Sequence, residues 1–359
     1  MLLKNLNIFV LDALFNLMIK LKTGKWFLND LTKVKKLNYN VFSCFHCGGG
    51  SSMGYKLAGL NVLGGVEIDA KMMRLYKENL KPKYSYLTSI QNFKKQKDLP
   101  EELFNLDILD GSPPCSNFSI IGKREENWGK AKHYAEGNTT QLLENLFFDF
   151  IDVVNLLKPK IVVAENVKGL IMSKAKGFVK EIIDRFKELN YDVQLFLLNS
   201  SKMGVPQNRE RVFFLARRKD LKLNNIKLNF NEKEITVEEA IKDIPESNKL
   251  CKSNYMYNLW AKTKPGERFS KYHINGSFFS SVKINKNKPF PTVTTGNSNH
   301  YHWNVFRNFI KEEFIRFQTF PEDYNFEKLN AVYVMGMSVP PFMIQRIANE
   351  IIEQWLNKH

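Results

Sequence analysis

A cysteine that follows two prolines is well placed to act as a nucleophile. Cys115 ends the segment Gly111-Ser112-Pro113-Pro114-Cys115, which comes directly after the apolar run LDILD at 106–110. Proline fixes φ and has no amide hydrogen to extend a strand, so the two prolines end the strand and define where the thiol lies. A lone cysteine is usually buried and inert. The polar, Ser-rich residues that follow Cys115 instead favour an exposed and reactive thiol.

A glutamate follows another apolar run. Glu165 comes after Ile161-Val162-Val163-Ala164, which is apolar on both faces, as expected of an interior parallel strand. Burial favours the protonated form of a carboxyl group, so we expect Glu165 to deliver a proton to a ring nitrogen of a bound base. The alternative is a structural glutamate that accepts hydrogen bonds from backbone amides.

A glycine-rich turn precedes a second glutamate. The run FHCGGGSSMG at 45–54 predicts a tight turn whose amides can face a ligand. Glu67 ends the next apolar run, where a carboxylate can accept both hydroxyls of a ribose. A plain turn with a surface glutamate is the alternative. The absence of a P-loop lysine argues against a phosphate cradle, and the single CxxC pair, Cys44 and Cys47, does not predict a metal site.

Short apolar runs alternate with helix-period segments, which predicts an α/β fold with a mainly parallel sheet. The expected strands are 40–45, 61–68, 106–110, 160–166, 192–199 and 211–218. The expected helices include 147–154, 178–189 and 344–356. Because the carboxyl ends of parallel strands line one crevice, Glu67, Cys115 and Glu165 are expected to converge there.

Composition and charge narrow the class of protein. The 359 residues are 43% hydrophobic and 25% charged, which excludes an intrinsically disordered or collagen-like chain. The net charge of +16 favours a polyanionic partner, either nucleic acid or an anionic membrane surface. Four scattered cysteines predict a reducing compartment rather than a disulfide framework. The apolar stretch 6–19, interrupted by Asp12 and Asn16, is expected to form an amphipathic helix rather than a membrane span or signal peptide.

Seven ordered motifs give the sequence a family resemblance. From Val41 to the C-terminal helix the chain resembles the DNA cytosine-5 methyltransferase family. The motifs are FHCGGGSSMGYKLAG, VEID, DILDGSPPCSNFS, AENV, QNRER, RFQTFP and GMSVPP. The resemblance implies a class I S-adenosylmethionine-dependent methyltransferase fold, Rossmann-like with a mainly parallel sheet, and a smaller target-recognition domain.

The resemblance also implies a covalent mechanism. Cys115 would attack carbon 6 of a cytosine that is flipped out of duplex DNA, while Glu165 protonates or hydrogen-bonds N3. Carbon 5 would then take the methyl group of S-adenosylmethionine, and β-elimination would release Cys115. Arg211, and with less support Arg209, would contact the flipped base or its phosphate; being two residues apart at the start of a strand, they are expected to share a face. The polar loop from Ser116 to about Gly137 would cover the base.

The resemblance implies a cofactor site without a metal. Its expected residues are Phe45, Gly48, Gly49, Gly50, Glu67, Ile68, Ser89, Ile90, Pro113, Leu146, Ser338 and Val339. Four residues depart from the family pattern, namely Cys47, Ser89, Ser116 and Met337. None of them is a bond-making group, so they bear on cofactor affinity more than on reaction type.

The expected organisation has four parts. Residues 1–38 form an N-terminal extension, 39–217 the catalytic and cofactor-binding domain, 218–299 the target-recognition domain, and 300–359 a return segment that completes the catalytic domain. The expected partner is double-stranded DNA, with a cognate restriction endonuclease acting separately in a bacterial or phage setting. We expect a cytoplasmic monomer without membrane attachment. The alternatives are a tRNA cytosine-5 methyltransferase and a cofactor-binding, DNA-binding module without catalysis.

Overall fold

Two compact units make up the structure, which is a computed structural model. It describes residues 24–114, 132–133, 140–141, 145–172, 176–247, 249–296 and 299–358. The larger unit lies within 33–199, 210–230 and 341–358, and the smaller unit within 24–32, 200–209 and 231–340.

The larger unit is built on a seven-stranded sheet with the order β3-β2-β1-β4-β7-β10-β8. The strands are β1 (Asn40–Cys44), β2 (Asn61–Glu67), β3 (Tyr84–Leu87), β4 (Ile108–Gly111), β7 (Ile161–Val167), β8 (Tyr191–Asn199) and β10 (Glu210–Arg218). The pairs of β1 with β2, β1 with β4, β2 with β3 and β4 with β7 are parallel. β10 runs antiparallel to both of its neighbours, β7 and β8. The mainly parallel sheet expected from the sequence is confirmed.

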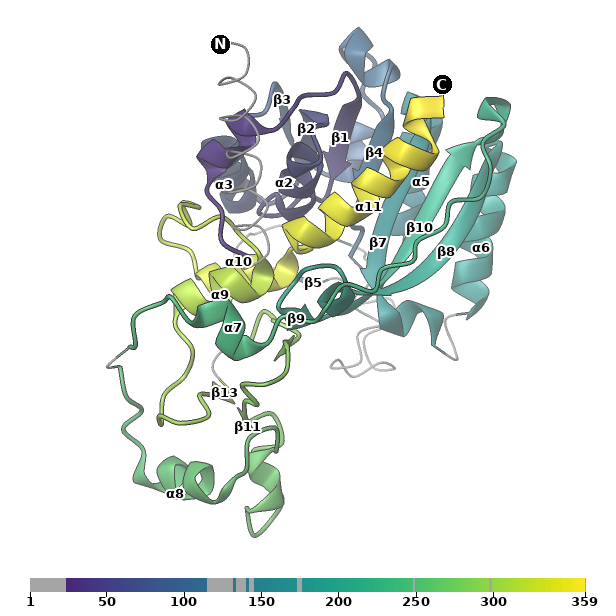
Figure 1. The fold of residues 1–359 in the computed structure, drawn as a ribbon. Coiled ribbons are helices and arrows are strands. Elements are labelled where there is room, and N and C mark those ends of the chain that lie inside the picture. Colours follow the sequence, from purple (N-terminus) through teal and green to yellow (C-terminus); the bar gives the residue numbers. More distant parts are fainter. Residues whose placement is uncertain are drawn as a thin grey trace, which may run out of the picture. The chain divides into compact units, whose positions relative to one another are not determined.

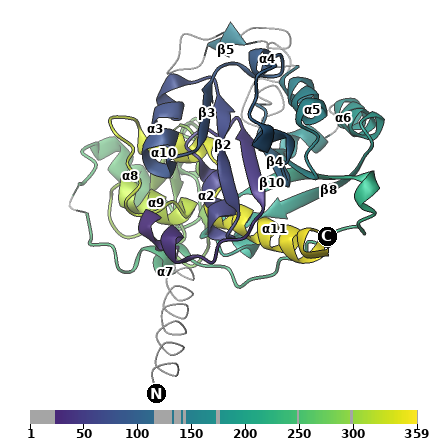
Figure 2. The same cartoon turned by 90° about the horizontal axis from the view of Figure 1, so that it is seen from above.

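Helices lie on both faces of this sheet (Figures 1 and 2). One face carries α2, α3 and α11, and the other carries α4, α5 and α6. Their bounds are α2 (Gly50–Leu57), α3 (Ala70–Leu80), α4 (Ile90–Phe93), α5 (Leu146–Leu157), α6 (Lys176–Glu188) and α11 (Pro341–Gln354). The expected helices near 147–154, 178–189 and 344–356 are therefore confirmed, the last continuing as a short 3-10 turn at Leu356–Lys358.

The C-terminal helix α11 packs closely on α2 because Gly54 has no side chain. A Cβ at Gly54 would lie 2.6 Å from Cβ of Ile344, too close for two carbon atoms. The apolar positions of α11, among them Ile344, Ile347 and Ile351, are fully buried. At roughly 25 cal/mol per Å² of apolar surface, such burial is the main source of the helix's stability.

The smaller unit has short strands and its own aromatic core. Phe290 stacks on Phe317 with ring centroids 4.2 Å apart, and both rings are fully buried. The side-chain amide of Gln318 donates to the backbone oxygens of Met335 and Ser338. Its elements are β9 (Gln207–Asn208), β11 (Val282–Lys283), β12 (Phe290–Pro291), β13 (His300–Tyr301), α7 (Val237–Ile241), α8 (Asn254–Lys262), α9 (Lys311–Gln318) and α10 (Ala331–Met337).

The limits of the two units differ from the domain ranges expected from the sequence. Residues 300–340 belong to the smaller unit, together with 200–209 and 24–32, whereas 218–230 belongs to the larger unit. The reason is local packing, since α9 and α10 bury their apolar and amide groups within the smaller unit. That this unit recognises the target stays a prediction. The helix expected at 6–19 lies outside the described residues.

None of the helices in the described part of the chain combines the length and the apolar character needed to cross a membrane.

Candidate active site

The glycine-rich turn after β1 places backbone amides at the carboxyl end of the strand. Phe45 and Cys47 both have positive φ, 57° and 49°, and Gly49, at φ 80°, is the N-cap of α2. A Cβ at Gly49 would lie 2.6 Å from Cδ1 of Leu80, so this position requires glycine in two ways. The tight turn expected within the run at 45–54 is confirmed: it occupies residues 45–49, and α2 begins at Gly50.

His46 has a structural role within this turn. Its ring stacks on Tyr76 at a centroid distance of 3.7 Å, and Nδ1 lies 3.0 Å from the backbone oxygen of Cys47. Burial lowers the pKa of His46 to about 4, so the ring is neutral near pH 7. No group of three metal-ligating side chains occurs among the described residues.

Cys44 is a free cysteine that is buried, where it packs as a small apolar side chain.

The carboxylate of Glu67, the last residue of β2, ties the turn to the next strand. Oε2 accepts from the amide of Cys47 at 3.0 Å, and Oε1 accepts from the amides of Ile68 and Asp69 at 2.8 and 3.1 Å. Burial raises the pKa of Glu67, while these three donors oppose that rise. A carboxylate has about four lone-pair sites, so acceptor capacity remains for a ligand hydroxyl.

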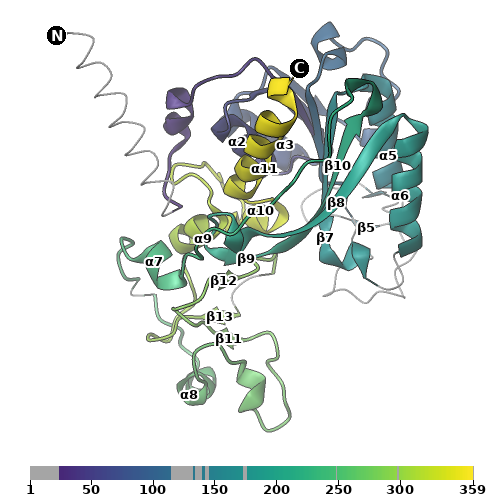
Figure 3. The same cartoon turned by 45° about the vertical axis from the view of Figure 1, so that its right-hand side comes forward.

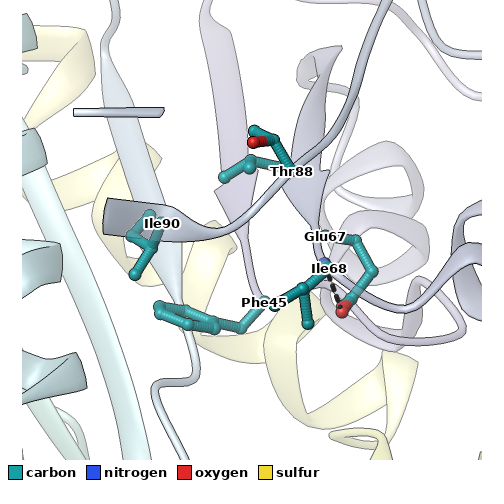
Figure 4. Close-up of a pocket in the computed structure, with 6 residues that line it drawn as sticks. Phe45, Glu67, Ile68, Thr88 and Ile90 are labelled. Carbon is teal, nitrogen blue, oxygen red and sulfur yellow. Dashed lines mark hydrogen bonds between the residues drawn. The ribbon is translucent and has the colours of Figure 1, made fainter. Parts of the chain in front are cut away.

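A pocket next to Glu67 combines apolar walls with this carboxylate (Figure 4). The Phe45 ring extends toward Ile90, and Ile68 lies beside the backbone of Glu67. The lining residues are Phe45, Val66, Glu67, Ile68, Thr88 and Ile90. Such a lining suits a flat apolar ring that is attached to a hydroxylated group. Thr88 and Val66 were not among the expected cofactor residues, although the family resemblance named their neighbours Glu67, Ser89 and Ile90.

The other expected cofactor residues have separate places. Ser89 begins α4, where its Oγ accepts from the amide of Asn92 at 3.2 Å. Leu146 is fully buried in the core beneath the sheet, and Pro113 lies just beyond β4. Ser338 and Val339 are buried in the smaller unit. Contact of these residues with a cofactor stays a prediction.

Glu165 forms an ion pair with Arg211. Its carboxylate oxygen Oε1 lies 2.9 Å from Nε of Arg211, and Glu165 is only 9% exposed. Glu165 lies within β7 rather than after it. Arg211 of β10 pairs with Val167, which lies two residues beyond Glu165 along β7. This diagonal placement across antiparallel strands brings the two side chains together. Burial lowers the pKa of Arg211, an effect that the neighbouring carboxylate opposes. The sequence alone did not predict this partner of Glu165, because the contact depends on the antiparallel register of β10 with β7.

Asn166 holds the segment that leads to Cys115. Its Nδ2 donates to the backbone oxygen of Pro113 at 3.1 Å, and its Oδ1 accepts from the amide of Val167. The side chain is almost fully buried, so this bond is protected from water. The amide of Ser112 also donates to the oxygen of Cys44, at the end of β1. The chain just before Cys115 is therefore fixed to β1 and β7. Cys115 and the loop to Gly137 lie outside the described residues, apart from the short strand β5 (Lys132–His133).

The two arginines of the QNRER segment do not share a strand face. Arg209 comes before β10, and its guanidinium donates to the oxygens of Val293 and Gly336 at 2.8 and 3.0 Å within the smaller unit. Arg211 pairs with Glu165 in the larger unit. The expectation of a shared face fails because the strand begins one residue too late to include Arg209.

A buried carboxyl group lies behind the glycine turn. Asp110 of β4 is 2% exposed and accepts hydrogen bonds from Oγ of Ser43 at 2.6 Å and from the hydroxyl of Tyr55 at 3.1 Å. Burial raises the pKa of Asp110 to about 7, and the negative charge of Glu165 adds to the rise. Asp110 therefore links β1, α2 and β4, the three elements around the turn.

The Asp110→Asn variant is expected to lose part of the pH dependence of stability. A carboxyl whose folded pKa is raised binds more protons in the folded state, so the free energy of unfolding falls as pH rises from about 4 to about 7. Raising the pKa of Asp110 from 3.8 to about 7 changes the free energy of unfolding by about 4 kcal/mol in all across this pH range. Denaturant unfolding at pH 5 and pH 8 measures it. Tyr55→Phe keeps the carboxyl but removes a donor that lowers the pKa of Asp110, so the slope is expected to persist and to extend to higher pH. Equal slopes in wild type and Asp110→Asn would refute the assignment.

Comparison with known proteins identifies relatives over nearly the whole chain. The family model described as C-5 cytosine-specific DNA methylase matches residues 39–353. The Type II methyltransferase M.DdeI of Desulfomicrobium norvegicum is 29% identical, over 87% of this chain and 88% of that protein. The Type II methyltransferase M1.HphI of Haemophilus parahaemolyticus is 26% identical, over 97% and 96%.

Solved structures share the fold. A structure described as a prophage-encoded DNA modification methyltransferase from E. coli has a TM-score of 0.67 at 21% identity, covering 89% of this chain and all of that one. Spodoptera frugiperda DNMT2 has a TM-score of 0.60 at 19% identity, covering 88% and 100%. The class I methyltransferase fold expected from the sequence is confirmed.

Proposed function

Because the chain belongs to the C-5 cytosine-specific DNA methylases and transfers a methyl group to carbon 5 of cytosine in DNA, we propose that Cys115 is its nucleophile and Glu165 its acid. The observation that carries this proposal is the meeting of four strand ends at one edge of the sheet. Phe45 follows β1, Glu67 ends β2, Pro113 follows β4 and Glu165 lies near the end of β7. The bond from Asn166 to Pro113 brings the acid-bearing strand next to the segment that precedes the thiol.

The chain's own residues carry the proton and the covalent bond. The Cys115 thiolate adds to carbon 6 of cytosine, and Glu165 donates a proton or a hydrogen bond to N3, so that electron density moves to carbon 5. After carbon 5 has been methylated, loss of its proton and elimination of the thiolate restore the aromatic ring. Thiolate suits both steps because it is a good nucleophile and a good leaving group.

Arg211 is proposed as a positioning residue for Glu165. Its Nε holds Oε1 at 2.9 Å, which fixes the orientation of a nearly buried carboxyl group. This differs from the direct contact with the flipped base that the family resemblance implies. Asn166 has a corresponding role for the Pro113 backbone.

The pocket at Glu67 fits the adenosine part of S-adenosylmethionine. Apolar side chains of Phe45, Ile68 and Ile90 would hold the base, and Glu67 would accept hydrogen bonds from the ribose hydroxyls. When bound, this cofactor supplies the electrophilic methyl group. The pocket offers three apolar side chains for a base and one carboxylate, held by backbone amides, for hydroxyl groups. This lining matches the chemistry of such a ligand.

The proposed setting is a bacterial restriction-modification system or a phage, in which the chain acts on duplex DNA as a monomer in the cytoplasm. Support comes from the relatives, which are named Type II methyltransferases, and from the prophage-encoded neighbour. A cognate restriction endonuclease would act as a separate protein. The excess of 53 Lys and Arg over 37 Asp and Glu suits a DNA substrate.

Replacing Glu67 by glutamine tests the cofactor site. The Glu67 carboxylate accepts from Cys47 on one oxygen and from Ile68 and Asp69 on the other. Glutamine has a single side-chain oxygen, so at least one of these buried backbone amides is left without an acceptor. We expect the affinity for S-adenosylmethionine to fall about tenfold or more, measured by titration calorimetry. Glu78→Gln, an exposed change on α3, is the control. An unchanged affinity in a folded Glu67→Gln variant would exclude this pocket.

A further inference from the structure

We propose that the loop at residues 269–281 of the smaller unit contacts the bases of duplex DNA through Ile274 and Phe279 and so determines which cytosines are methylated. This inference rests on the proposed function, since it assumes that duplex DNA is the substrate. It assigns specificity to two named side chains that lie outside the motifs of the family resemblance.

The base of this loop is fixed by backbone hydrogen bonds. The amide of Phe269 donates to the oxygen of Ser281 at 2.9 Å, and the amide of Lys283 donates to the oxygen of Glu267 at 3.1 Å. The Phe269 side chain is fully buried and stacks on Tyr301 at 4.7 Å. The two ends of the loop are thus held together and anchored in the core of the smaller unit.

The loop is also ordered at its tip. Nδ1 of His273 accepts from the amides of Asn275 and Ser277, both at 3.1 Å, so its ring proton lies on Nε2. The His273 ring packs edge-on against Phe278 at 5.2 Å and Tyr255 of α8 at 6.1 Å. Phe278 has a φ of 63°, a left-handed conformation that costs free energy in a residue other than glycine.

This ordered loop presents two large apolar side chains to solvent. Ile274 is 94% exposed and Phe279 is 68% exposed. Ile274 and Phe279 lie close together in the sequence of one hydrogen-bonded loop, and most of each side chain is exposed, which makes the loop a candidate contact surface for a partner. Figures 1 and 3 show α8 and β11, the elements next to this loop, at one end of the smaller unit. Apolar side chains recognise bases by contacting thymine methyl groups or by inserting between base steps.

The charge around the loop favours DNA as that partner. Residues 249–283 contain seven Lys and Arg and a single acidic residue, Glu267. The guanidinium of Arg268 lies 4.1 Å from the centre of the Phe279 ring and donates to the oxygen of Phe279. A cation that lies beside an exposed ring can meet a phosphate while the ring meets the adjacent base. An anionic membrane surface would attract the same charges, and the experiment separates the two.

The experiment compares Ile274→Ser and Phe279→Ser in the full chain with wild type. Phe27→Ser is the matched control, because Phe27 is a 37% exposed apolar residue of the same unit and lies outside both the loop and the basic segment 249–283. A pool of random-sequence duplexes is methylated and then sequenced after bisulfite treatment. This gives the preferred sequence context and the ratio of methylation in that context to methylation in the next best context. Fluorescence anisotropy gives the affinity for the preferred duplex, and co-sedimentation gives binding to anionic phosphatidylserine vesicles. Binding of S-adenosylmethionine together with thermal unfolding shows that each variant is folded.

The two loop variants are expected to lose about tenfold in sequence preference and in affinity for the preferred duplex, with unchanged cofactor affinity. The control is expected to match wild type. Retention of wild-type preference and DNA affinity by both loop variants would overturn the proposal, as would an effect confined to binding of anionic phosphatidylserine vesicles. If wild type methylates no cytosine, the proposed function fails; weaker DNA binding by the loop variants would then still support the loop contact, and unchanged binding would overturn it.

Discussion

Replacing Cys115 by serine is expected to remove methyl transfer to DNA, with a fall in kcat/KM on the order of 10³-fold or more. Serine is nearly isosteric with cysteine, but its hydroxyl is a far weaker nucleophile at neutral pH than a thiolate. Binding of S-adenosylmethionine should be unchanged, because the pocket residues lie on β2 and α4 and directly after β1, β2 and β3. Transfer of a radiolabelled methyl group to duplex DNA measures the rate, and calorimetry measures the binding.

The matched control for this variant is Cys251→Ser. Cys251 is a partly exposed free cysteine. It belongs to the smaller unit, whereas the sheet belongs to the larger unit. It should retain wild-type rates. If Cys115→Ser kept more than a tenth of the wild-type kcat/KM, or if Cys251→Ser were the inactive variant, the assignment of the nucleophile would be wrong.

The Glu165→Gln variant is expected to lower kcat about 10²- to 10³-fold while the Kd for S-adenosylmethionine stays within twofold of wild type. Glutamine cannot transfer a proton to N3, and its loss of charge also removes the ion pair with Arg211. Arg211→Lys separates these two effects, since it keeps a positive charge but not the planar guanidinium that orients Oε1. We expect a smaller fall in kcat for Arg211→Lys than for Glu165→Gln. Single-turnover kinetics measures both.

Glu210→Gln is the control for removing a carboxylate from the same pair of strands. Glu210 pairs with Lys168 at 2.9 Å in a more exposed position, one residue before Arg211. Its loss should leave kcat unchanged, because an exposed ion pair contributes about 1 kcal/mol or less. Parallel losses of catalysis and cofactor binding in Glu165→Gln would show that Glu165 supports the fold rather than the chemistry.

The apolar runs predicted most of the sheet, and the glycine-rich run at 45–54 predicted the turn after β1. Strands such as β1 and β7 are buried on both faces, which gives a continuous apolar pattern that can be read without the structure. β3 was missed because its four residues, Tyr84–Leu87, are half-buried or exposed and show no such run. Thr88, which follows β3, was not expected as a pocket residue either, although the family resemblance named the next two residues, Ser89 and Ile90.

The pairing of side chains was less accessible to sequence analysis. Arg211 and Glu165 are far apart in the chain, and their contact depends on the antiparallel register of β10 with β7, which periodicity does not encode. Asp110 looked like one polar residue in a strand, yet its burial and its bonds to Ser43 and Tyr55 arise from three separate elements. The exposure of Ile274 and Phe279 was likewise hidden, since composition does not reveal which aromatic or aliphatic residues a loop leaves outside the core.

The central claim is that Cys115 forms a covalent bond with the cytosine being methylated. Duplex DNA with 5-fluorocytosine at the target position tests it most directly, because fluorine cannot leave carbon 5 as a proton does, so elimination of the thiol is blocked. With S-adenosylmethionine present, mass spectrometry should detect a stable protein–DNA adduct on the peptide that contains Cys115. Absence of any adduct, while the same enzyme methylates the unfluorinated duplex, would contradict the covalent mechanism.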